Sequence, residues 1–437
     1  MTLHVLNGRI GYKQNRLSES HFQAEKGLCL TTNAQGLIAP FQRWYKFKEA
    51  FAPSLVIEQI NDLPSPPSLI VDTFGGSGTT ALISSYLGIK CHTIEVNPFL
   101  ADLIKAKTSD HDPHSILLSY TEVIAKAALD RGRSIDKYKS TLPPTFIEES
   151  EKERWIYNAD IASRILAYRA AIDGLSHEGN ARLLRILLGS CLVEVSNVRI
   201  NGKGRRYRSG WQNRLVSVDD LDSMFQEKVS AAVEDISNFS RYSRVQPCVT
   251  HGDSRQKASE LPSDIDLAIF SPPYPNSFDY TDIYNLELWM LGYLKAGADN
   301  RELREATLRS HVQIKRDFKD APSGSPLLSE TLKRLTQVRA ALWSKYIPEM
   351  VGAYFTDMLV IIESIAQKLS QEGRIVMVVG DSSYAGIHVP VANILAELSE
   401  SIGLKVKSLE AARSMRASPQ QGGNLVLPET LITLGAQ

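Results

Sequence analysis

The sequence predicts an α/β fold, in which helices cover both faces of a doubly wound, mostly parallel sheet. Short apolar runs of the kind that form buried parallel strands recur along the chain. They are Ser68–Phe74, Cys91–Val96, Cys248–Asp253, Asp266–Pro273 and Arg374–Asp381. Helical segments separate these runs, and strands that alternate with helices form a parallel sheet. The first two runs flank Thr79–Leu87, a helix by composition, and so predict a βαβ unit.

Two further stretches complete this fold. At the end of the chain, Lys405–Leu409 and Leu425–Leu434 are expected to form a closing hairpin. Between the second and third runs, residues 110–245 have a mostly helical pattern, and we interpret them as a helical insertion. The chain therefore divides into residues 1–109, the insertion 110–245 and residues 246–437.

Composition limits the class of protein. The 437 residues carry 49 Lys+Arg and 49 Asp+Glu, so the formal net charge is +0 and any phosphate-binding surface must be local. The four cysteines are scattered without a close pair, so we expect no disulfide framework and no metal site. The first residues lack the apolar core of a signal peptide, and no apolar run is long enough to span a bilayer. We therefore expect a cytoplasmic protein with no membrane partner.

A glycine-rich loop follows the first predicted strand. In Asp72–Thr80 the glycines allow a tight turn and a close approach of a ligand to the backbone, and the next helix directs its N–H groups at that ligand. A Walker A loop would need a lysine, which this stretch lacks. Glu95 ends the second strand about 20 residues further on, where an acid binds ribose hydroxyls. The loop therefore predicts an adenosine-containing cofactor, and a nicotinamide dinucleotide stays open at this point.

A rigid polar turn ends the fourth run. In Ser271–Tyr274 two consecutive prolines stop the strand, and they leave outward-facing carbonyls and no N–H donors. Open α/β sheets bind their ligands at this edge, beyond the carboxyl ends of the strands. Rigid carbonyls and a serine hydroxyl can accept hydrogen bonds from an –NH2 group while the tyrosine ring stacks on its base. The turn therefore predicts a site that holds an amino group with its lone pair aimed at an electrophile.

Together these motifs resemble those of the DNA amino-methyltransferases, which methylate adenine N6 or cytosine N4. The family pairs a Phe-x-Gly-x-Gly cofactor loop with an (Asp/Asn/Ser)-Pro-Pro-(Tyr/Phe/Trp) turn, and here these read Phe74–Gly78 and Ser271–Tyr274. The resemblance covers about residues 40–110 and 246–437. It implies a Rossmann-like S-adenosylmethionine-dependent methyltransferase fold, with a seven-stranded sheet whose last strand is antiparallel.

The resemblance also implies roles for individual residues. The catalytic residues would be Ser271, Pro272, Pro273 and Tyr274. The residues that bind S-adenosylmethionine would be Phe51, Asp72, Phe74, Gly76, Gly78, Thr79, Glu95 and Asp253. Residues 1–109 would then bind the cofactor, and residues 246–437 would carry the catalytic part of the methyltransferase domain.

The expected reaction is direct methyl transfer to the exocyclic amino group of a flipped base in double-stranded DNA. Serine at the first position of the turn resembles the cytosine-N4 enzymes more than the adenine-N6 enzymes, so cytosine N4 is the preferred target. Adenine N6 stays open, as do an RNA or tRNA amino-methyltransferase and a nicotinamide-dependent oxidoreductase. The pair Pro247-Cys248 superficially resembles the nucleophile of cytosine-C5 enzymes, but it begins a predicted strand, and packing is the better interpretation of Cys248.

A local basic segment is the candidate DNA-binding surface. Asn197–Arg214 concentrates arginine and lysine without any acid, so its cations would neutralise phosphates while an aromatic ring, Tyr207 or Trp211, stacks or wedges. The candidate contacts are Arg199, Lys203, Arg205, Arg206, Arg208 and Trp211. The polar segment Leu294–Pro348 is a further candidate for approaching the substrate. A cognate restriction endonuclease that acts separately is a candidate partner.

Overall fold

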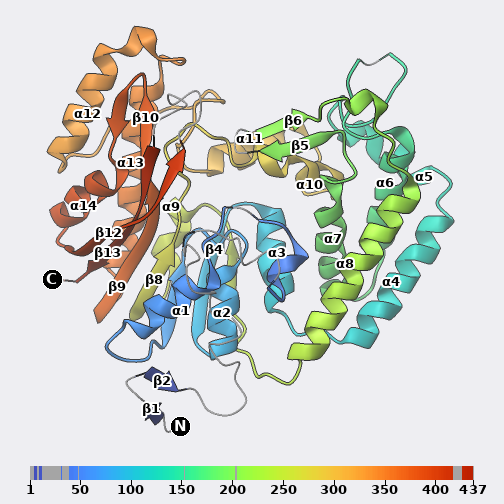
Figure 1. The fold of residues 1–437 in the computed structure, drawn as a ribbon, viewed down its shortest axis with the longest axis horizontal. Coiled ribbons are helices and arrows are strands. Elements are labelled where there is room, and N and C mark those ends of the chain that lie inside the picture. The colour runs from blue at the N-terminus through green and yellow to red at the C-terminus, as the bar shows by residue number, and fades with distance from the viewer. Residues whose placement is uncertain are drawn as a thin grey trace.

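One sheet dominates the computed structural model, which describes residues 4–6, 9–11, 31, 39–47, 49–151, 153–201, 204–416 and 426–436. Across this sheet the strand order is β12 (Lys405–Arg416), β13 (Val426–Gly435), β9 (Leu369–Gly380), β8 (Ile265–Phe270), β3 (Leu69–Asp72), β4 (Lys90–Glu95) and β7 (Cys248–His251). Most of these strands can be followed in Figure 1. Six point the same way, whereas β13 is antiparallel to both of its neighbours. The predicted parallel sheet with an antiparallel last strand and a closing hairpin is confirmed.

Alternate residues of the central strands pack on opposite faces of the sheet, as the period of a strand requires. Ile70 and Val376 belong to the core under helices α1–α3, whereas Val71 and Met377 belong to the core under helices α12–α14. The first three helices are α1 (Pro53–Asn61), α2 (Thr79–Leu87) and α3 (Pro98–Thr108). The other three are α12 (Pro326–Gln337), α13 (Ile347–Ala366) and α14 (Val391–Ser401). The sheet is therefore covered on both faces.

The βαβ unit β3–α2–β4 fixes the position of the glycine loop (residues 74–78). Strands β3 and β4 pair in parallel, with Leu69 opposite Lys90. Gly78 (φ 79°) and Gly88 (φ 73°) flank α2 in the left-handed conformation, which glycine adopts without steric cost. Helix α2 has the predicted bounds, and the loop is held where β3 ends.

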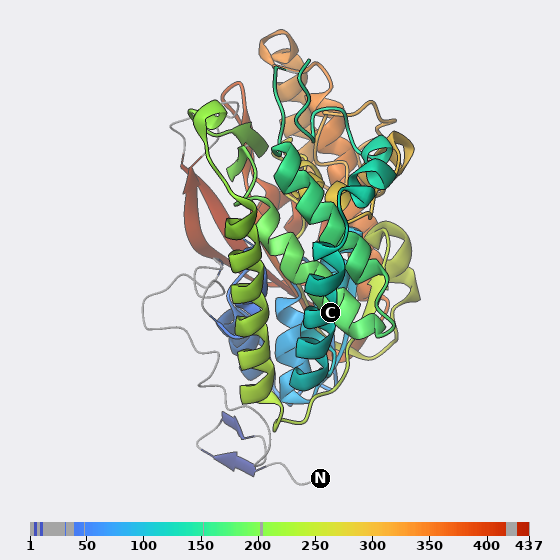
Figure 2. The same cartoon turned by 90° about the vertical axis from the view of Figure 1, so that its right-hand side faces the viewer.

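The block that follows α3 packs beside the sheet, on the right of Figure 1, and its helices face the viewer in Figure 2. Its helices are α4 (Pro113–Ala128), α5 (Arg133–Tyr138), α6 (Ala159–Asp173), α7 (Glu178–Leu192) and α8 (Val218–Phe239). Leu184 of α7 and Phe225 of α8 share one core with Leu82 of α2, so the block extends the core on that face. A hairpin, β5 (Val198–Asn201) and β6 (Gly204–Tyr207), interrupts the helices. The helical pattern was predicted, whereas this hairpin was not.

Several short elements complete the fold. They are β1 (His4–Leu6), β2 (Arg9–Gly11), α9 (Ser254–Lys257), α10 (Asn285–Met290), α11 (Gly297–Ala306), β10 (Ser382–Tyr384) and β11 (Ile387–Val389). Strand β9 begins at Leu369, earlier than the sequence predicted, because Leu369 pairs with Ile265 and extra residues of β9 separate this pair from the pair Leu267–Arg374. None of the described helices combines the length and the apolar character that crossing a membrane would need.

Candidate active site

A pocket at the carboxyl ends of β3, β4 and β8 joins the two motifs that the sequence singled out. Residues 74–77 of the glycine loop and residues 271–274, which we call the proline turn, both line it. Strands β3 and β8 are adjacent and parallel, so segments far apart in the chain end at the same edge. Apart from Gly78, the predicted cofactor residues line this pocket too: Phe51, Asp72, Phe74, Gly76, Thr79, Glu95 and Asp253.

Glycines in the loop are required by space and by backbone conformation. Gly76 (φ 51°) and Gly78 (φ 79°) are left-handed. A Cβ on Gly78 would lie 2.9 Å from Cγ1 of Ile104, and one on Gly75 would lie 2.5 Å from Oγ1 of Thr93. Gly78 therefore supports the loop from behind instead of lining the pocket, because its missing side chain lets α3 pack against the turn.

Glu95 ties the loop to the end of β4. Its Oε2 accepts a hydrogen bond from the N–H of Gly76 (2.7 Å), and its Oε1 accepts one from the N–H of Asn97 (2.8 Å). Burial raises the pKa of Glu95 to about 7, although these N–H groups favour the charged form. Burial also raises the pKa of Asp72 to about 6. Two acids of altered pKa thus stand at one end of the pocket, a pattern typical of functional sites.

An apolar and aromatic lining faces these acids. Phe47 and Phe51, from the segment before α1, are almost buried and line the pocket. The Phe47 ring stacks on Tyr284 with centroids 5.9 Å apart and an interplanar angle of 12°. The sequence identified Phe51 but not Phe47, because its stacking partner Tyr284 comes from a distant part of the chain.

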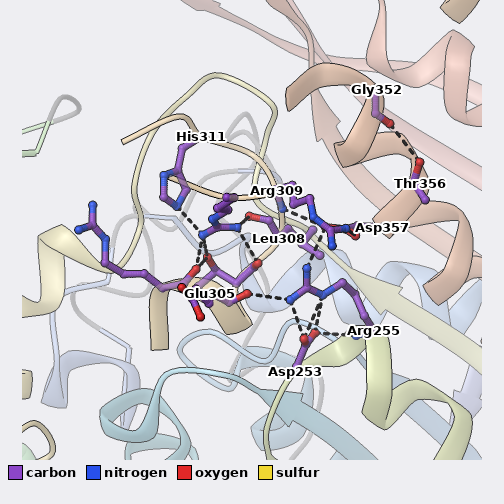
Figure 3. Close-up of polar contacts among 12 residues, drawn as sticks. Asp253, Arg255, Glu305, Leu308, Arg309, His311, Gly352, Thr356 and Asp357 are labelled. Carbon is purple, nitrogen blue, oxygen red and sulfur yellow. Dashed lines mark hydrogen bonds and ion pairs between the residues drawn. The ribbon is translucent and has the colours of Figure 1, made fainter. Parts of the chain in front are cut away.

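Asp253 is held in place by an arginine that the sequence did not predict. Figure 3 shows Arg255 between Asp253 and Asp357 of α13. The Nε of Arg255 donates to Oδ1 of Asp253 (2.9 Å) and its Nη2 to Oδ2 (2.6 Å), while its Nη1 donates to Oδ2 of Asp357 (3.2 Å). Asp357 also accepts the backbone N–H of Arg309 (3.0 Å). This buried network connects the pocket to the segment that follows α11.

That segment forms a wall of the pocket, and we call residues 306–313 the wall segment. Its lining residues are Ala306, Thr307, Leu308, Ser310 and His311. The N–H of Ser277 donates to the carbonyl of Ser310 (2.9 Å), so the wall segment is attached just beyond the proline turn. Burial lowers the pKa of His311 to about 4, which leaves a neutral imidazole at physiological pH. These residues belong to the polar segment that was a further candidate, but no local motif identified them individually.

The proline turn lines the pocket, and hydrogen bonds fix both of its hydroxyl groups. The hydroxyl of Ser271 donates to the carbonyl of Val378 on β9 (3.0 Å), and the hydroxyl of Tyr274 donates to Oε1 of Glu429 on β13 (2.9 Å). Because the Ser271 proton is already engaged, its oxygen is left with lone pairs that can only accept. Burial and the neighbouring Glu429 raise the pKa of Tyr274 well above its usual value. The turn can therefore bind a donor such as an amino group.

Lys107 supports the glycine loop from inside the fold, and no sequence motif identified it. Its side chain is fully buried, and its Nζ donates to the carbonyl of Ser77 (2.8 Å) and to Oε1 of Gln42 (2.9 Å). Burial lowers the pKa of Lys107 to about 7. The loop is thus fixed by a lysine that forms hydrogen bonds with neutral oxygens.

The basic segment lies outside the pocket lining, and its residues divide into two groups. Arg199 and Arg206 are exposed and stand opposite each other on β5 and β6. The guanidinium of Arg208 instead donates to the carbonyls of Ser196, Val198 and Val193. The guanidinium of Arg205 lies over the ring of Phe146 (5.8 Å).

Trp211 requires a correction. It is 7% exposed and packs edge-on against Trp155, with Tyr207 on another side. The prediction that Trp211 stacks on or wedges into DNA is therefore wrong for this conformation, because the ring is already part of the core. Lys203 lies outside the described residues. Cys248 is exposed on the edge strand β7 and does not line the pocket.

The fold is the Rossmann-like fold of S-adenosylmethionine-dependent methyltransferases, with a seven-stranded, mostly parallel sheet. The chain is similar to Type II methyltransferase M.AvaI of Nostoc sp. and of Anabaena variabilis, each 25% identical over 408 residues, 85% of this chain and 80% of the relative. Type II methyltransferase M.BsoBI of Geobacillus stearothermophilus is 24% identical over 430 residues, 86% of this chain and 81% of the relative. These similarities support a methyltransferase.

Two other comparisons add little. No family model matches the chain. Among solved structures, the rRNA methyltransferase aviRa from Streptomyces viridochromogenes is 8% identical, with coverage of 96% of this chain and 93% of its own and a TM-score of 0.30. A complex of LepI with SAM is 11% identical, with coverage of 78% and 95% and a TM-score of 0.16. TM-scores this low carry no weight for the assignment.

Proposed function

We propose that this protein is a DNA methyltransferase that transfers a methyl group from S-adenosylmethionine to an exocyclic amino group, cytosine N4 by preference. One observation carries the proposal: the glycine loop and the proline turn line one pocket. Similarity to Type II methyltransferases over 85% of the chain supports DNA as the substrate and a place in a restriction-modification system. A cognate endonuclease would then act separately on the same recognition sequence.

The residues at one end of the pocket fit S-adenosylmethionine. The carboxylate of Glu95 suits ribose hydroxyls, and the carboxylate of Asp253 suits the amino group of adenine. Gly76 has no side chain to fill the space beside Phe47, and Phe51 offers an apolar surface for the methionine end. When bound, the cofactor supplies a methyl group that its own sulfonium charge activates, so positioning provides much of the catalysis.

The proline turn would bind the amino group of the target base. Ser271 accepts one N–H because its own proton is given to Val378, and the carbonyl of Pro272 accepts another. Both bonds leave the lone pair of the amino nitrogen directed away from the turn. A new N–C bond then forms as the S–C bond breaks, and the nitrogen releases one proton to water. Tyr274 would stack on the ring of the base.

Access to this turn requires an extruded nucleotide. In a duplex the amino group is paired and stacked, so the base must leave the helix before the methyl group can reach it. The wall segment, with Ser310 and the neutral His311, lies beside the turn and would form one side of the space that receives the base.

The hairpin β5–β6 is the proposed contact with the DNA backbone. Arg199 and Arg206 are directly opposite across the hairpin, an arrangement that repels unless an anion neutralises it. The hairpin packs against the turn that contains Tyr284, which lines the pocket. A phosphate near the flipped nucleotide would supply the missing negative charge.

Incubation with S-adenosyl[methyl-³H]methionine and unmethylated phage DNA tests this function, with bulk tRNA as the competing substrate. We expect label in DNA and not in tRNA. Ser271→Ala should reduce the rate about 10- to 100-fold, because a positioned acceptor is lost. Ser259→Ala, an exposed serine away from the pocket, is the matched control. Label in tRNA alone would favour an RNA amino-methyltransferase, and tight binding of NAD instead of S-adenosylhomocysteine would favour an oxidoreductase.

A further inference from the structure

The closing hairpin reaches into the pocket through an ion pair. Arg413 of β12 and Glu429 of β13 are direct cross-strand partners, and both line the pocket. A register shift between Ala411 and Arg413 immediately precedes this pair. Such irregularities re-aim side chains at the rims of sheets, and here the shift accompanies a charged pair directed at the site.

The buried carboxylate of Glu429 bonds to both Arg413 and Tyr274. Glu429 is 1% exposed. It accepts the Nε of Arg413 (2.5 Å) and its Nη2 (2.9 Å), and it also accepts the hydroxyl of Tyr274 (2.9 Å). A two-point arginine–carboxylate contact is among the most directional interactions in proteins. A buried carboxylate costs free energy unless it is paired, so Arg413 is what allows Glu429 to stand behind the tyrosine.

Tyr274 is therefore anchored at both ends of its ring. At one end the two prolines of the turn restrict its backbone. At the other end its hydroxyl is bonded to Glu429 and lies 3.5 Å from Oγ of Ser271. Without Glu429 the ring could turn about its side-chain bonds, and its face would no longer have one orientation in the pocket.

We propose that Arg413 and Glu429 are positioning residues for methyl transfer, which orient the Tyr274 ring to receive the extruded base. This inference rests on the proposed function. The contacts of Glu429 join the pair to Tyr274 of the proline turn, so the expected effect is on the base and not on the cofactor. Strands β12 and β13 thereby gain a role in catalysis besides closing the sheet.

The test compares Glu429→Gln, Tyr274→Phe and the double variant in the full-length protein. Gln keeps an acceptor for the tyrosine but loses the charge that holds Arg413, and Phe keeps the ring but loses the anchor. Each single variant should lower kcat on unmethylated phage DNA about 5- to 20-fold, while the dissociation constant for S-adenosylhomocysteine stays within about twofold. Because both changes interrupt the same chain of contacts from Arg413 through Glu429 to Tyr274, the double variant should be no slower than the slower single one.

Glu410→Gln, an exposed acid on β12, the strand that carries Arg413, is the matched control and should keep the wild-type kcat. The thermal unfolding midpoints of the wild type, the two single variants and the double variant provide a second double-mutant cycle. In it the effects of the two substitutions on stability should again be non-additive. An unchanged kcat for Glu429→Gln, rate losses that multiply, or an equal loss of cofactor affinity would each overturn the inference. If the wild-type protein adds no methyl group to DNA, the proposed function itself fails, and that result is seen before any variant is compared.

Discussion

The backbone N–H of Gly76 donates to the carboxylate of Glu95 across 2.7 Å, so the tip of the glycine loop and the acid at the end of β4 form one unit. Burial raises the pKa of this acid to about 7 in the unliganded protein. A protonated Glu95 accepts ribose hydroxyls poorly, and binding must then remove the proton. Affinity for S-adenosylhomocysteine should therefore rise as the pH increases through 7 and level off above 8, with a slope that approaches tenfold per pH unit below pH 6.

Calorimetric titration between pH 5.5 and 8.5 measures this dependence. Glu95→Gln should bind about tenfold more weakly at pH 8 and should lose the step near pH 7. Any remaining dependence in that variant should lie near pH 6, where Asp72 titrates. A wild-type affinity that is flat from pH 6 to 8 would contradict the role given to Glu95.

The contact between Gly78 and Ile104 predicts an unusually costly alanine substitution. Gly78 (φ 79°) and Gly132 (φ 83°) have the same left-handed backbone, but a Cβ on Gly78 meets Ile104 at 2.9 Å and one on Gly132 meets nothing within 4 Å. Gly132→Ala should lower the free energy of unfolding by about 1–2 kcal/mol. Gly78→Ala should lower it by a further 1–3 kcal/mol, roughly the cost of overpacking. If urea unfolding gives the same loss of stability for Gly78→Ala and Gly132→Ala, the loop can shift to accommodate the added side chain.

Asp357 neutralises two arginines behind the pocket. Its side chain is 3% exposed and forms ion pairs with Arg255 and Arg309. Asp357→Asn leaves Arg309 without its acid and Arg255 with Asp253 alone, and it should cost about 3–5 kcal/mol in the free energy of unfolding. Glu363→Gln, on the same helix α13, is the control and should change it by less than about 0.5 kcal/mol. If urea unfolding gives the same value for both variants, the network does not hold the wall segment in place.

The cross-strand pair Arg199 and Arg206 predicts a specific change in DNA binding. Reversing both charges (Arg199→Glu with Arg206→Glu) should weaken binding of duplex DNA and reduce the slope of log affinity against log salt by about 2. Arg241→Glu, an exposed arginine beyond α8, should leave that slope unchanged. Fluorescence anisotropy over a salt series measures it. An identical slope for the two proteins would place the DNA elsewhere on the surface.

The sequence predicted those parts of the site that are contiguous in the chain. The glycine loop and the proline turn each carry their chemistry within a few residues, and the bounds of α2 follow from Gly78 and Gly88. Because both motifs follow parallel strands, their meeting at one edge could be expected before the neighbours of either were known.

What the sequence could not supply comes from long-range packing. Lys107, Asp357 and Glu429 are ordinary residues of a helix or strand, and only the tertiary fold brings each one against a loop or a turn. Trp211 was misjudged for the same reason, since a run of arginines suggests an exposed loop while the hairpin buries the ring against Trp155. Charge patterns report composition, and burial depends on partners far along the chain.

The most direct test of the central claim is the identity of the methylated nucleoside. Unmethylated DNA is incubated with the protein and S-adenosyl[methyl-²H3]methionine, digested to nucleosides and analysed by mass spectrometry. We predict trideuterated N4-methylcytosine, which Ser271→Ala should largely abolish. N6-methyladenine would keep the amino-group mechanism and change only the base. Trideuterated 5-methylcytosine, or no labelled nucleoside from a protein that binds S-adenosylhomocysteine, would contradict transfer to an amino group held by the proline turn.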